Sequence, residues 1–224
     1  IIHISLRKFT TRSGRRLKSD YERLSSGNTI NGLVLDLRYN SGGSAYGTRI
    51  LLDYLIDKDD SDATIYSINN SSEVFYFGDY DDENIDPFGK SKFVLLQNED
   101  SASASEITAG VLKHYDEALV LGNKSFGKGI SQTLKELADE SGIAIPFQSL
   151  LLPGEVDYHN QGIEPEIYYT TEPGSLSDDS QLDAAIQWIN SGEVSGAEAS
   201  EDLTLNKGHQ RRDPSYKYSH RIIY

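Results

Sequence analysis

The chain of 224 residues contains no cysteine. A disulfide framework, a thiol nucleophile and a thiolate metal site are therefore all excluded. Long apolar runs are also absent. None approaches the roughly 20 residues that a membrane-spanning helix needs, so we expect no integral membrane segment. No secretory signal pattern precedes Ile1, and we expect the chain to be a processed part of a longer protein.

Basic residues are scarce relative to acidic ones. The chain has 21 Lys and Arg against 35 Asp and Glu, which gives a formal net charge of -14. Nucleic acids and anionic membranes are themselves negatively charged, so this balance argues against both as partners. The remaining composition, 37% hydrophobic and 25% charged, is ordinary for a globular protein of one large domain or two small ones.

The hydrophobic pattern predicts an α/β fold. Residues 32–37 and 92–97 are short, mainly apolar runs, as is typical of strands covered on both faces. Further strands are expected at 1–10, at 63–77, at 118–121 and at 143–152, the last one broken by Pro146. Helices are expected where apolar residues recur at helical spacing, at 17–24, 50–55, 103–115 and 181–189. The chain begins with strand, helix, strand, glycine loop and helix, which is an α/β order.

The composition changes near residue 190. Residues 190–202 are rich in Gly, Ser, Ala and Glu and lack apolar periodicity, which is typical of a linker. The tail that follows shows no pattern that assigns it to an element. We therefore expect one domain over residues 1–190, followed by a linker and an unassigned tail over 191–224.

Serines gather where a predicted strand passes into a predicted helix, in the run Asn98-Glu-Asp-Ser-Ala-Ser-Ala-Ser-Glu106. A hydrolytic serine needs a proton acceptor, an oxyanion site and a rigid turn, and free N–H groups at a helix start favour developing negative charge. The same run also fits simple helix capping, because Ser103 and Glu106 have the Ser-x-x-Glu spacing of a capping box. This run alone does not separate the two interpretations.

A glycine-rich segment, Gly122-Asn-Lys-Ser-Phe-Gly-Lys-Gly129, follows the predicted strand at 118–121. Gly122, Gly127 and Lys128 have the spacing of a phosphate-binding loop, so nucleotide hydrolysis is an alternative. Two features argue against it. Gly129 stands where a serine or threonine should hold magnesium, and the candidate aspartate strand ending at Asp36 precedes the loop instead of following it.

These two segments occur in order with two further motifs, and together they make the sequence resemble the carboxyl-terminal processing, or tail-specific, serine peptidases. The family's Ser-Ala-Ser-Ala-Ser-Glu and Phe-Gly-Lys-Gly motifs appear at 101–106 and 126–129, with Ser103 and Lys128 25 residues apart. Its Asp-Leu-Arg-x-Asn-x-Gly-Gly loop appears at 36–43. Its Gly-Ile-x-Pro-Asp motif appears as Gly-Ile-Glu-Pro-Glu at 162–166.

The resemblance implies that Ser103 is the nucleophile, Lys128 the general base and Gln132 the residue that orients the lysine. A lysine accepts a proton at neutral pH only where its amine is largely uncharged, and removal from water favours the uncharged amine. Glycines on both sides of Lys128 allow close packing around that amine. Gln132 would hydrogen-bond the amine without adding charge.

The resemblance also implies the rest of the site and the setting of the enzyme. The N–H group of Ala104 and one from the loop of Gly42 and Gly43 would form the oxyanion hole, since glycines let the backbone approach a substrate closely. The implied fold is a β-β-α spiral of the crotonase and Clp protease type with additional β strands. The implied activity is that of an endopeptidase that cleaves extended or C-terminal protein segments through an acyl-enzyme. Neither a metal nor a cofactor is implied, and the implied location is outside the cytoplasm, in the periplasm, in the cell envelope or secreted.

Some features depart from the family pattern. His114 stands where some members have an aspartate, and it suggests a Ser-His alternative, but on a helix it would lie roughly 16 Å from Ser103. Too few residues precede Ile30 to hold the peptide-binding PDZ domain that many members carry. A second hypothesis is therefore a noncatalytic ligand- or protein-binding module on the same fold.

Overall fold

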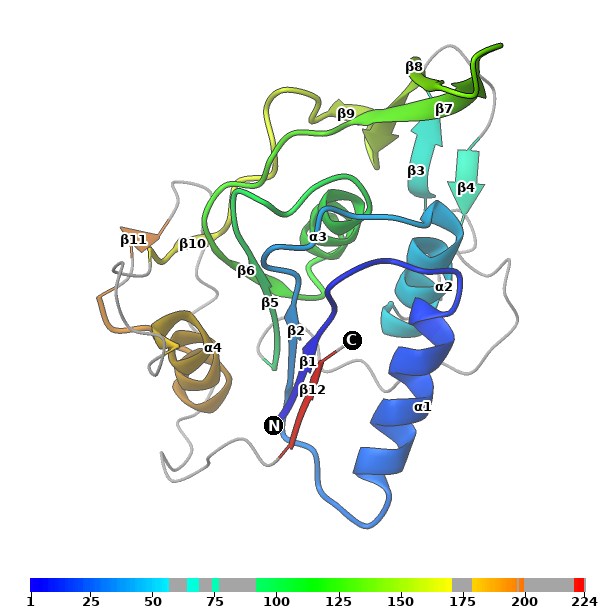
Figure 1. Cartoon of the computed structure of the whole chain (residues 1–224). Helices are drawn as coiled ribbons and strands as arrows, with labels where there is room; N and C mark the ends of the chain where they lie inside the picture. The colour runs from blue at the N-terminus through cyan, green and yellow to red at the C-terminus, as the bar shows by residue number, and fades with distance from the viewer. Residues whose placement is uncertain are drawn as a thin grey trace.

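A seven-stranded sheet forms the centre of the part of the chain described in this computed structural model (Figure 1). The structure describes residues 1–56, 64–68, 74–76, 92–170, 179–196, 198–199 and 220–223. Across the sheet the strands are β11 (Glu198–Ala199), β10 (Ile167–Tyr168), β6 (Leu119–Gly122), β5 (Phe93–Gln97), β2 (Leu33–Asp36), β1 (Ile2–Ser5) and β12 (His220–Ile223).

The strands of this sheet pair in parallel, except that β10 and β11 are antiparallel. Every residue of β2, β5 and β6 is buried, because their Leu- and Val-rich sequences are covered on both faces of the sheet. Parallel strands finish at the same edge. The loops that follow β1, β2, β5 and β6 therefore leave the sheet side by side.

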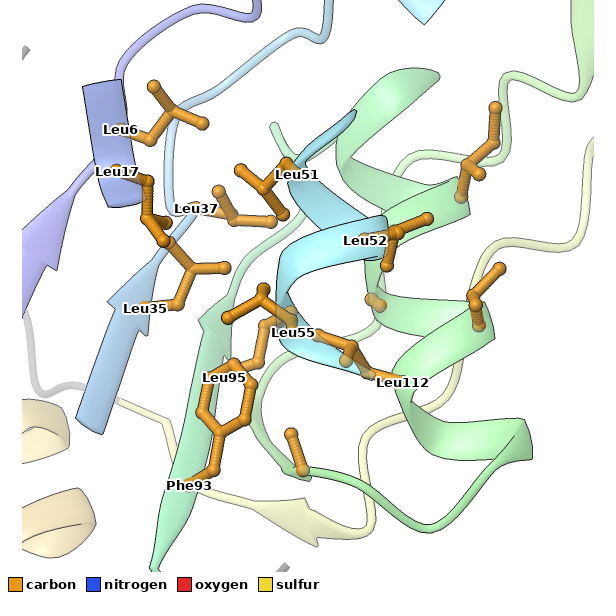
Figure 2. Packing of buried hydrophobic residues seen from close by; sticks show 14 of the residues in the cluster. Leu6, Leu17, Leu35, Leu37, Leu51, Leu52, Leu55, Phe93, Leu95 and Leu112 are labelled. Atoms are coloured by element: carbon orange, nitrogen blue, oxygen red, sulfur yellow. The ribbon is translucent and has the colours of Figure 1, made fainter. Parts of the chain in front are cut away.

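Helices cover both faces of the sheet. Their bounds are Ser13–Ser25 for α1, Ala45–Leu55 for α2, Ala104–His114 for α3 and Ser180–Ser191 for α4. On one face Leu35 and Leu95 pack with Leu51 and other residues of α1, α2 and α3 (Figure 2). On the other face Val34 packs with Trp188 of α4. Successive strand residues point to opposite faces, which is why neighbours such as Val34 and Leu35 join different clusters.

A smaller antiparallel sheet follows the loop of residues 123–129, which carries Lys128. Its order is β4 (Val74–Tyr76), β3 (Thr64–Ile68), β8 (Gly142–Leu152) and β7 (Ile130–Glu136), with β9 (Val156–Asp157) paired to β8. The expectation that Pro146 breaks the strand at 143–152 is wrong, because β8 continues through it. Pro146 lies opposite Gln132, where the register between β7 and β8 shifts, and proline is tolerated at such irregularities.

The predicted α/β class is confirmed, and each of the four expected helices lies within or overlaps a helix of the structure. Strands β11 and β12 come from residues 191–224, which the sequence predicts to be a linker and an unassigned tail. The boundary at residue 190 stays a prediction. Among the described helices, none is both long enough and apolar enough to cross a bilayer.

Candidate active site

Three neighbouring strands, β2, β5 and β6, deliver the three motif loops to one edge of the sheet. The loops cover residues 37–44, 98–103 and 123–129. Backbone hydrogen bonds join them: Ala102 N donates to Asn40 O at 3.0 Å, and Phe126 N donates to Ser101 O at 3.0 Å. Ligand sites of open parallel sheets form at this edge, so the loops lie where a site is expected.

Ser103 stands at the turn between β5 and α3 in an unusual backbone conformation, with φ 56° and ψ -112°. A non-glycine residue held at positive φ costs about 1–3 kcal/mol and persists only where its surroundings enforce it. Ser101 supplies part of that support, because its buried hydroxyl donates to Leu37 O at 2.9 Å and accepts from Asn98 N at 3.0 Å. The half-buried Ser103 is thus presented by a rigid, strained turn, as the nucleophilic serine of α/β-hydrolases is.

The glycine loop lies directly against the Ser103 turn. Gly42 has a φ of 97°, which side chains of L-residues rarely adopt. A Cβ atom at Gly42 would lie 2.6 Å from Ala102 O and 2.9 Å from Ser103 Cβ. Only glycine therefore lets this loop approach Ser103 so closely.

The two glycines of the loop differ in the hydrogen bonds of their N–H groups. Gly42 N donates to Asn40 Oδ1 at 2.9 Å, whereas Gly43 N has no acceptor among the described residues. Ala104 is the first residue of α3, where N–H groups lack an intrahelical acceptor. The sequence suggests the N–H groups of Gly42, Gly43 and Ala104 as donors to an oxyanion. Those of Gly43 and Ala104 are the two that are not already used within the described residues of the site.

The carboxylate of Glu106 joins the Ser103 turn to the lysine loop. Its Oε2 atom accepts from Ser103 N at 2.8 Å and from Lys128 N at 2.7 Å. Its Oε1 atom accepts from Gly127 N at 2.5 Å and from Ser125 Oγ at 2.6 Å. Glu106 is 0% exposed. One buried carboxylate therefore sets the backbone of both proposed catalytic residues.

The side chains of the proposed dyad are less tightly joined than their backbones. Lys128 is half-buried, and Gln132 is exposed on β7. Within the described residues no hydrogen bond joins Lys128 Nζ to Ser103 Oγ or to Gln132. Catalytic hydrogen bonds are often long in enzymes without substrate and tighten in the complex. The contact between these side chains stays a prediction.

A buried ionic network, which the sequence analysis missed, fixes the start of the glycine loop. The Arg38 guanidinium donates to Asp36 at 2.9 and 2.7 Å, to Asp179 at 2.7 Å and to Gln181 at 3.1 Å. Burial alone would raise the pKa of Asp36, but the hydrogen bonds from Arg38 hold it well below its usual range. At Asp179 burial likewise acts to raise the pKa, but the hydrogen bonds from Arg38 outweigh it and the pKa is lowered. The network ties β2 to the first turn of α4.

The alternatives based on other residues find no support in the geometry. His114 is the last residue of α3 and so lies at the opposite end of that helix from Ser103. The loop at 123–129 leads into strand β7, whereas a phosphate-binding loop opens a helix, so the nucleotide alternative is wrong. His159 is half-buried, with Nδ1 3.2 Å from Gly127 O, and thus packs on the lysine loop. In the described ranges, no three His, Asp or Glu side chains are grouped to hold a metal ion.

Glu106 is the main residue whose role the sequence analysis did not find, because capping explained it. The expected bond from Ser103 N to the Glu106 side chain is present. The feature of the sequence that indicates a wider role for Glu106 is the joint occurrence of the motifs at 101–106 and 126–129. A glutamate that only caps a helix would be exposed to solvent. It would not need to occur together with a Phe-Gly-Lys-Gly segment that begins 20 residues later, at 126–129.

Known proteins resemble this chain over most of its described length. The family profile described as peptidase family S41 matches residues 1–169. The chloroplastic carboxyl-terminal-processing peptidase 2 of Arabidopsis thaliana is 35% identical over 164 residues, or 73% of this chain and 31% of the relative. The carboxyl-terminal-processing protease of a Picosynechococcus species is 36% identical over 141 residues, or 62% of this chain and 32% of the relative.

A solved structure agrees with these relatives. The photosystem II D1 C-terminal processing protease superimposes with a TM-score of 0.63 at 30% identity, covering 78% of this chain and 43% of that one. The chain spans about a third of the length of the two curated relatives. The family profile includes all four motifs and every strand that delivers the loops described above. The chain belongs to peptidase family S41.

Proposed function

We propose that this chain is the catalytic core of a serine endopeptidase that cleaves extended or C-terminal protein segments. The observation that carries the proposal is the buried carboxylate of Glu106, which anchors the backbone of both Ser103 and Lys128. Serine with lysine is one of the nucleophile and base pairings found in hydrolases. The names of the relatives, carboxyl-terminal-processing peptidase and protease, support a substrate with a C-terminal segment to remove.

In the proposed mechanism Ser103 Oγ attacks the carbonyl carbon of the scissile peptide while its proton passes to Lys128 Nζ. The tetrahedral intermediate then collapses, the C–N bond breaks, and Lys128 returns the proton to the leaving amine. A water molecule attacks the resulting ester with Lys128 again as base, which releases the acid and restores the hydroxyl of Ser103. Gln132 would orient the amine by hydrogen bonding during both steps.

The negative charge of the intermediate would be held by backbone donors. The N–H groups of Ala104 and Gly43 are the proposed pair, since Gly42 N already donates to Asn40. Fixed donors of this kind stabilise the developing oxyanion without having to reorient during the reaction, and one such donor is typically worth about 10²–10³ in kcat.

The extent and setting of the enzyme are part of the proposal. Residues 1–190 would form the catalytic domain, with strands β11 and β12 of 191–224 added at the two edges of its sheet, and protein or peptide substrates would be the partners. We place the enzyme outside the cytoplasm because of its resemblance to processing peptidases. Neither a metal nor a cofactor takes part in the proposed chemistry.

A noncatalytic binding module on the same fold is the second candidate. The observation that favours it is the missing hydrogen bond between Lys128 Nζ and Ser103 Oγ in the described part of the chain. Such a module would bind peptides and leave them intact.

Cleavage of extended peptides by two pairs of variants, each compared with the wild type, tests the proposal. Ser103→Ala and Lys128→Ala should each lose at least about 10³-fold in kcat/KM. Their controls are Ser141→Ala on an exposed turn and Lys124→Ala, an exposed lysine of the same loop paired with Glu164. Both controls should retain wild-type rates. A fluorophosphonate probe should form an adduct on Ser103 in the wild type, and intact peptides together with an unlabelled Ser103 would favour the binding module.

A further inference from the structure

The first turn of α1 and the residues just before it border an open surface cavity of about 500 Å³ lined by Thr10, Arg12, Arg15 and Arg16, all of them exposed. The turn that presents these side chains is fixed by its own hydrogen bonds. Ser13 N donates to Thr10 O at 3.1 Å, Thr10 N donates to Ser13 Oγ at 2.9 Å, and Arg12 N donates to Thr10 Oγ1 at 3.2 Å. Three arginines therefore line one open cavity beside a well-defined turn.

Charge in this part of the chain is opposite in sign to that of the whole. Residues 1–19 contain six Lys and Arg and no Asp or Glu, although the formal net charge of the chain is -14. Arg12 and Arg15 form no ion pair with any described carboxylate, and Arg16 Nε lies 4.0 Å from Asp20. A local surplus of positive charge of this kind attracts an anion.

The cavity adjoins the loop that borders the nucleophile. Thr10 follows Phe9, whose N donates to Gly42 O at 3.0 Å and whose O accepts from Ser44 N at 2.9 Å. Gly42 in turn lies against Ser103. The start of α1 lies at the edge of the sheet from which the motif loops leave (Figure 1). Backbone contacts therefore connect the segment beside the cavity to Ser103 through Phe9 and Gly42.

We propose that this cavity binds a carboxylate of the substrate peptide and so helps to choose which peptides are cleaved. The inference rests on the proposed peptidase function and adds to it a recognition site for one chemical group. The carboxylate belongs either to the free C-terminus of the substrate or to an Asp or Glu side chain. If it is the C-terminus, it lies on the leaving-group side of the scissile bond.

A carboxylate suits this cavity better than a polyanion. A guanidinium group binds a carboxylate through two parallel hydrogen bonds. A cavity of this size has room for one carboxylate in contact with two or three guanidinium groups. An extended polyanion would meet the rest of a chain whose balance is strongly acidic.

Binding to the inactive Ser103→Ala protein tests the inference without cleavage. Fluorescence anisotropy would compare three peptides of one sequence: a free C-terminal acid, its amide, and the amide with one added Glu side chain. The acid or the Glu peptide should bind about fivefold more tightly than the plain amide, the size expected for two exposed ion pairs. A preference for the acid alone assigns the C-terminus, and a preference for the Glu peptide assigns an acidic side chain.

Variants of the cavity provide the second comparison, in the same Ser103→Ala background. Replacing Arg12 and Arg15 together by Ala should remove the preference and leave binding of the plain amide unchanged. The matched control is Arg23→Ala, an exposed arginine in the last turn of the same helix, which should keep the preference. The preference of the unmodified cavity should also shrink as salt is raised from 0.05 to about 0.5 M, because exposed charges are screened.

The outcomes separate this inference from the proposed function. Equal binding of all three peptides, or a preference that survives the double replacement, would overturn the carboxylate site while leaving labelling of Ser103 untouched. A preference lost in the double variant supports the site. If Ser103 also resists the fluorophosphonate in the wild type, the proposed peptidase function fails and the carboxylate site belongs to a binding module.

Discussion

Among single residues, Glu106 has the largest consequence for the candidate site. Its two oxygens accept four hydrogen bonds, two from the backbone of Ser103 and Lys128 and two from Gly127 and Ser125. A carboxylate accepts on both oxygens, whereas an amide turns one acceptor into a donor. The arrangement therefore needs a carboxylate in particular, not only a side chain of this length.

Glu106→Gln should disconnect the Ser103 turn from the lysine loop. The amide NH2 group would face two N–H or O–H donors, so we expect a loss of about 2–3 kcal/mol in unfolding free energy. We also expect labelling of Ser103 by a fluorophosphonate to slow at least about tenfold, because Ser103 and Lys128, the proposed nucleophile and base, lose their common anchor. Urea unfolding and the labelling rate of the folded fraction measure the two effects.

The control for this variant is Glu166→Gln. Glu166 is also buried, at 5% exposure, and its Oε2 accepts from Val120 N at 2.9 Å. It belongs to the segment that enters β10, and within the described residues no hydrogen bond or ion pair joins it to Ser103 or Lys128. We expect it to lower stability without slowing the labelling of folded protein. Wild-type labelling of folded Glu106→Gln would show that the anchor has no part in activity.

A substitution at Gly42 tests the contact between the glycine loop and the Ser103 turn. Gly42→Ala places a Cβ 2.6 Å from Ala102 O at a φ of 97°, so the loop must move away from Ser103. We expect peptide cleavage to fall by at least about 10²-fold, as when an oxyanion donor is lost. Gly27→Ala is the matched control, because Gly27 has a φ of 77° but no atom within 4 Å of the added Cβ.

The kcat of each glycine variant distinguishes backbone strain at positive φ from displacement of the glycine loop. Both variants carry the conformational cost of an alanine at positive φ, and both should lose stability in thermal unfolding. Only Gly42→Ala should lose kcat. Equal kcat values for the two variants would contradict the close approach of the loop.

At the scale of elements, the sequence predicts those segments whose pattern is set by local burial. Strands β2 and β5 are apolar except for their last residues, Asp36 and Gln97, and the sequence predicts them, as it does the helices with one apolar face. Strand β7 was not expected, because five of its seven residues are exposed and its sequence has no apolar run. Strand β10 has only two residues, which is too short for any periodicity. Pro146 misled the prediction because its partner strand shifts register at that point.

The candidate site was predictable where it follows a motif and not where it depends on distant contacts. The spacing of Ser103 and Lys128 and the residues around them predict the pair, and the structure joins their backbones through Glu106. The role of Arg38 was not found, because its partners Asp179 and Gln181 lie 141 and 143 positions away in the sequence. Without an alignment, no feature of a single sequence indicates that such separated side chains meet.

At the scale of the whole molecule, the acidic balance and the buried ionic network act in opposite directions as pH falls. A formal net charge of -14 means that protonating surface carboxylates relieves repulsion in the folded chain. Protonating Asp36 or Asp179 instead removes the partners of a buried guanidinium. A comparison of two proteins that share the surface charges isolates the second effect.

Asp36→Asn provides that comparison. The folded pKa of Asp36 lies below its unfolded value of about 3.9, so its contribution to stability is complete above that pH and is lost as pH falls toward the folded value. At pH 7 the variant should be less stable than the wild type by about 3 kcal/mol, because a buried pair is broken. At pH 3 the difference should be about 1 kcal/mol smaller, since only the wild type has a carboxylate at this position to protonate on unfolding. Urea unfolding of both proteins at pH 7, 5, 4 and 3 measures the difference directly, and a constant difference over this range would mean that Arg38 does not hold Asp36 ionised in the folded chain.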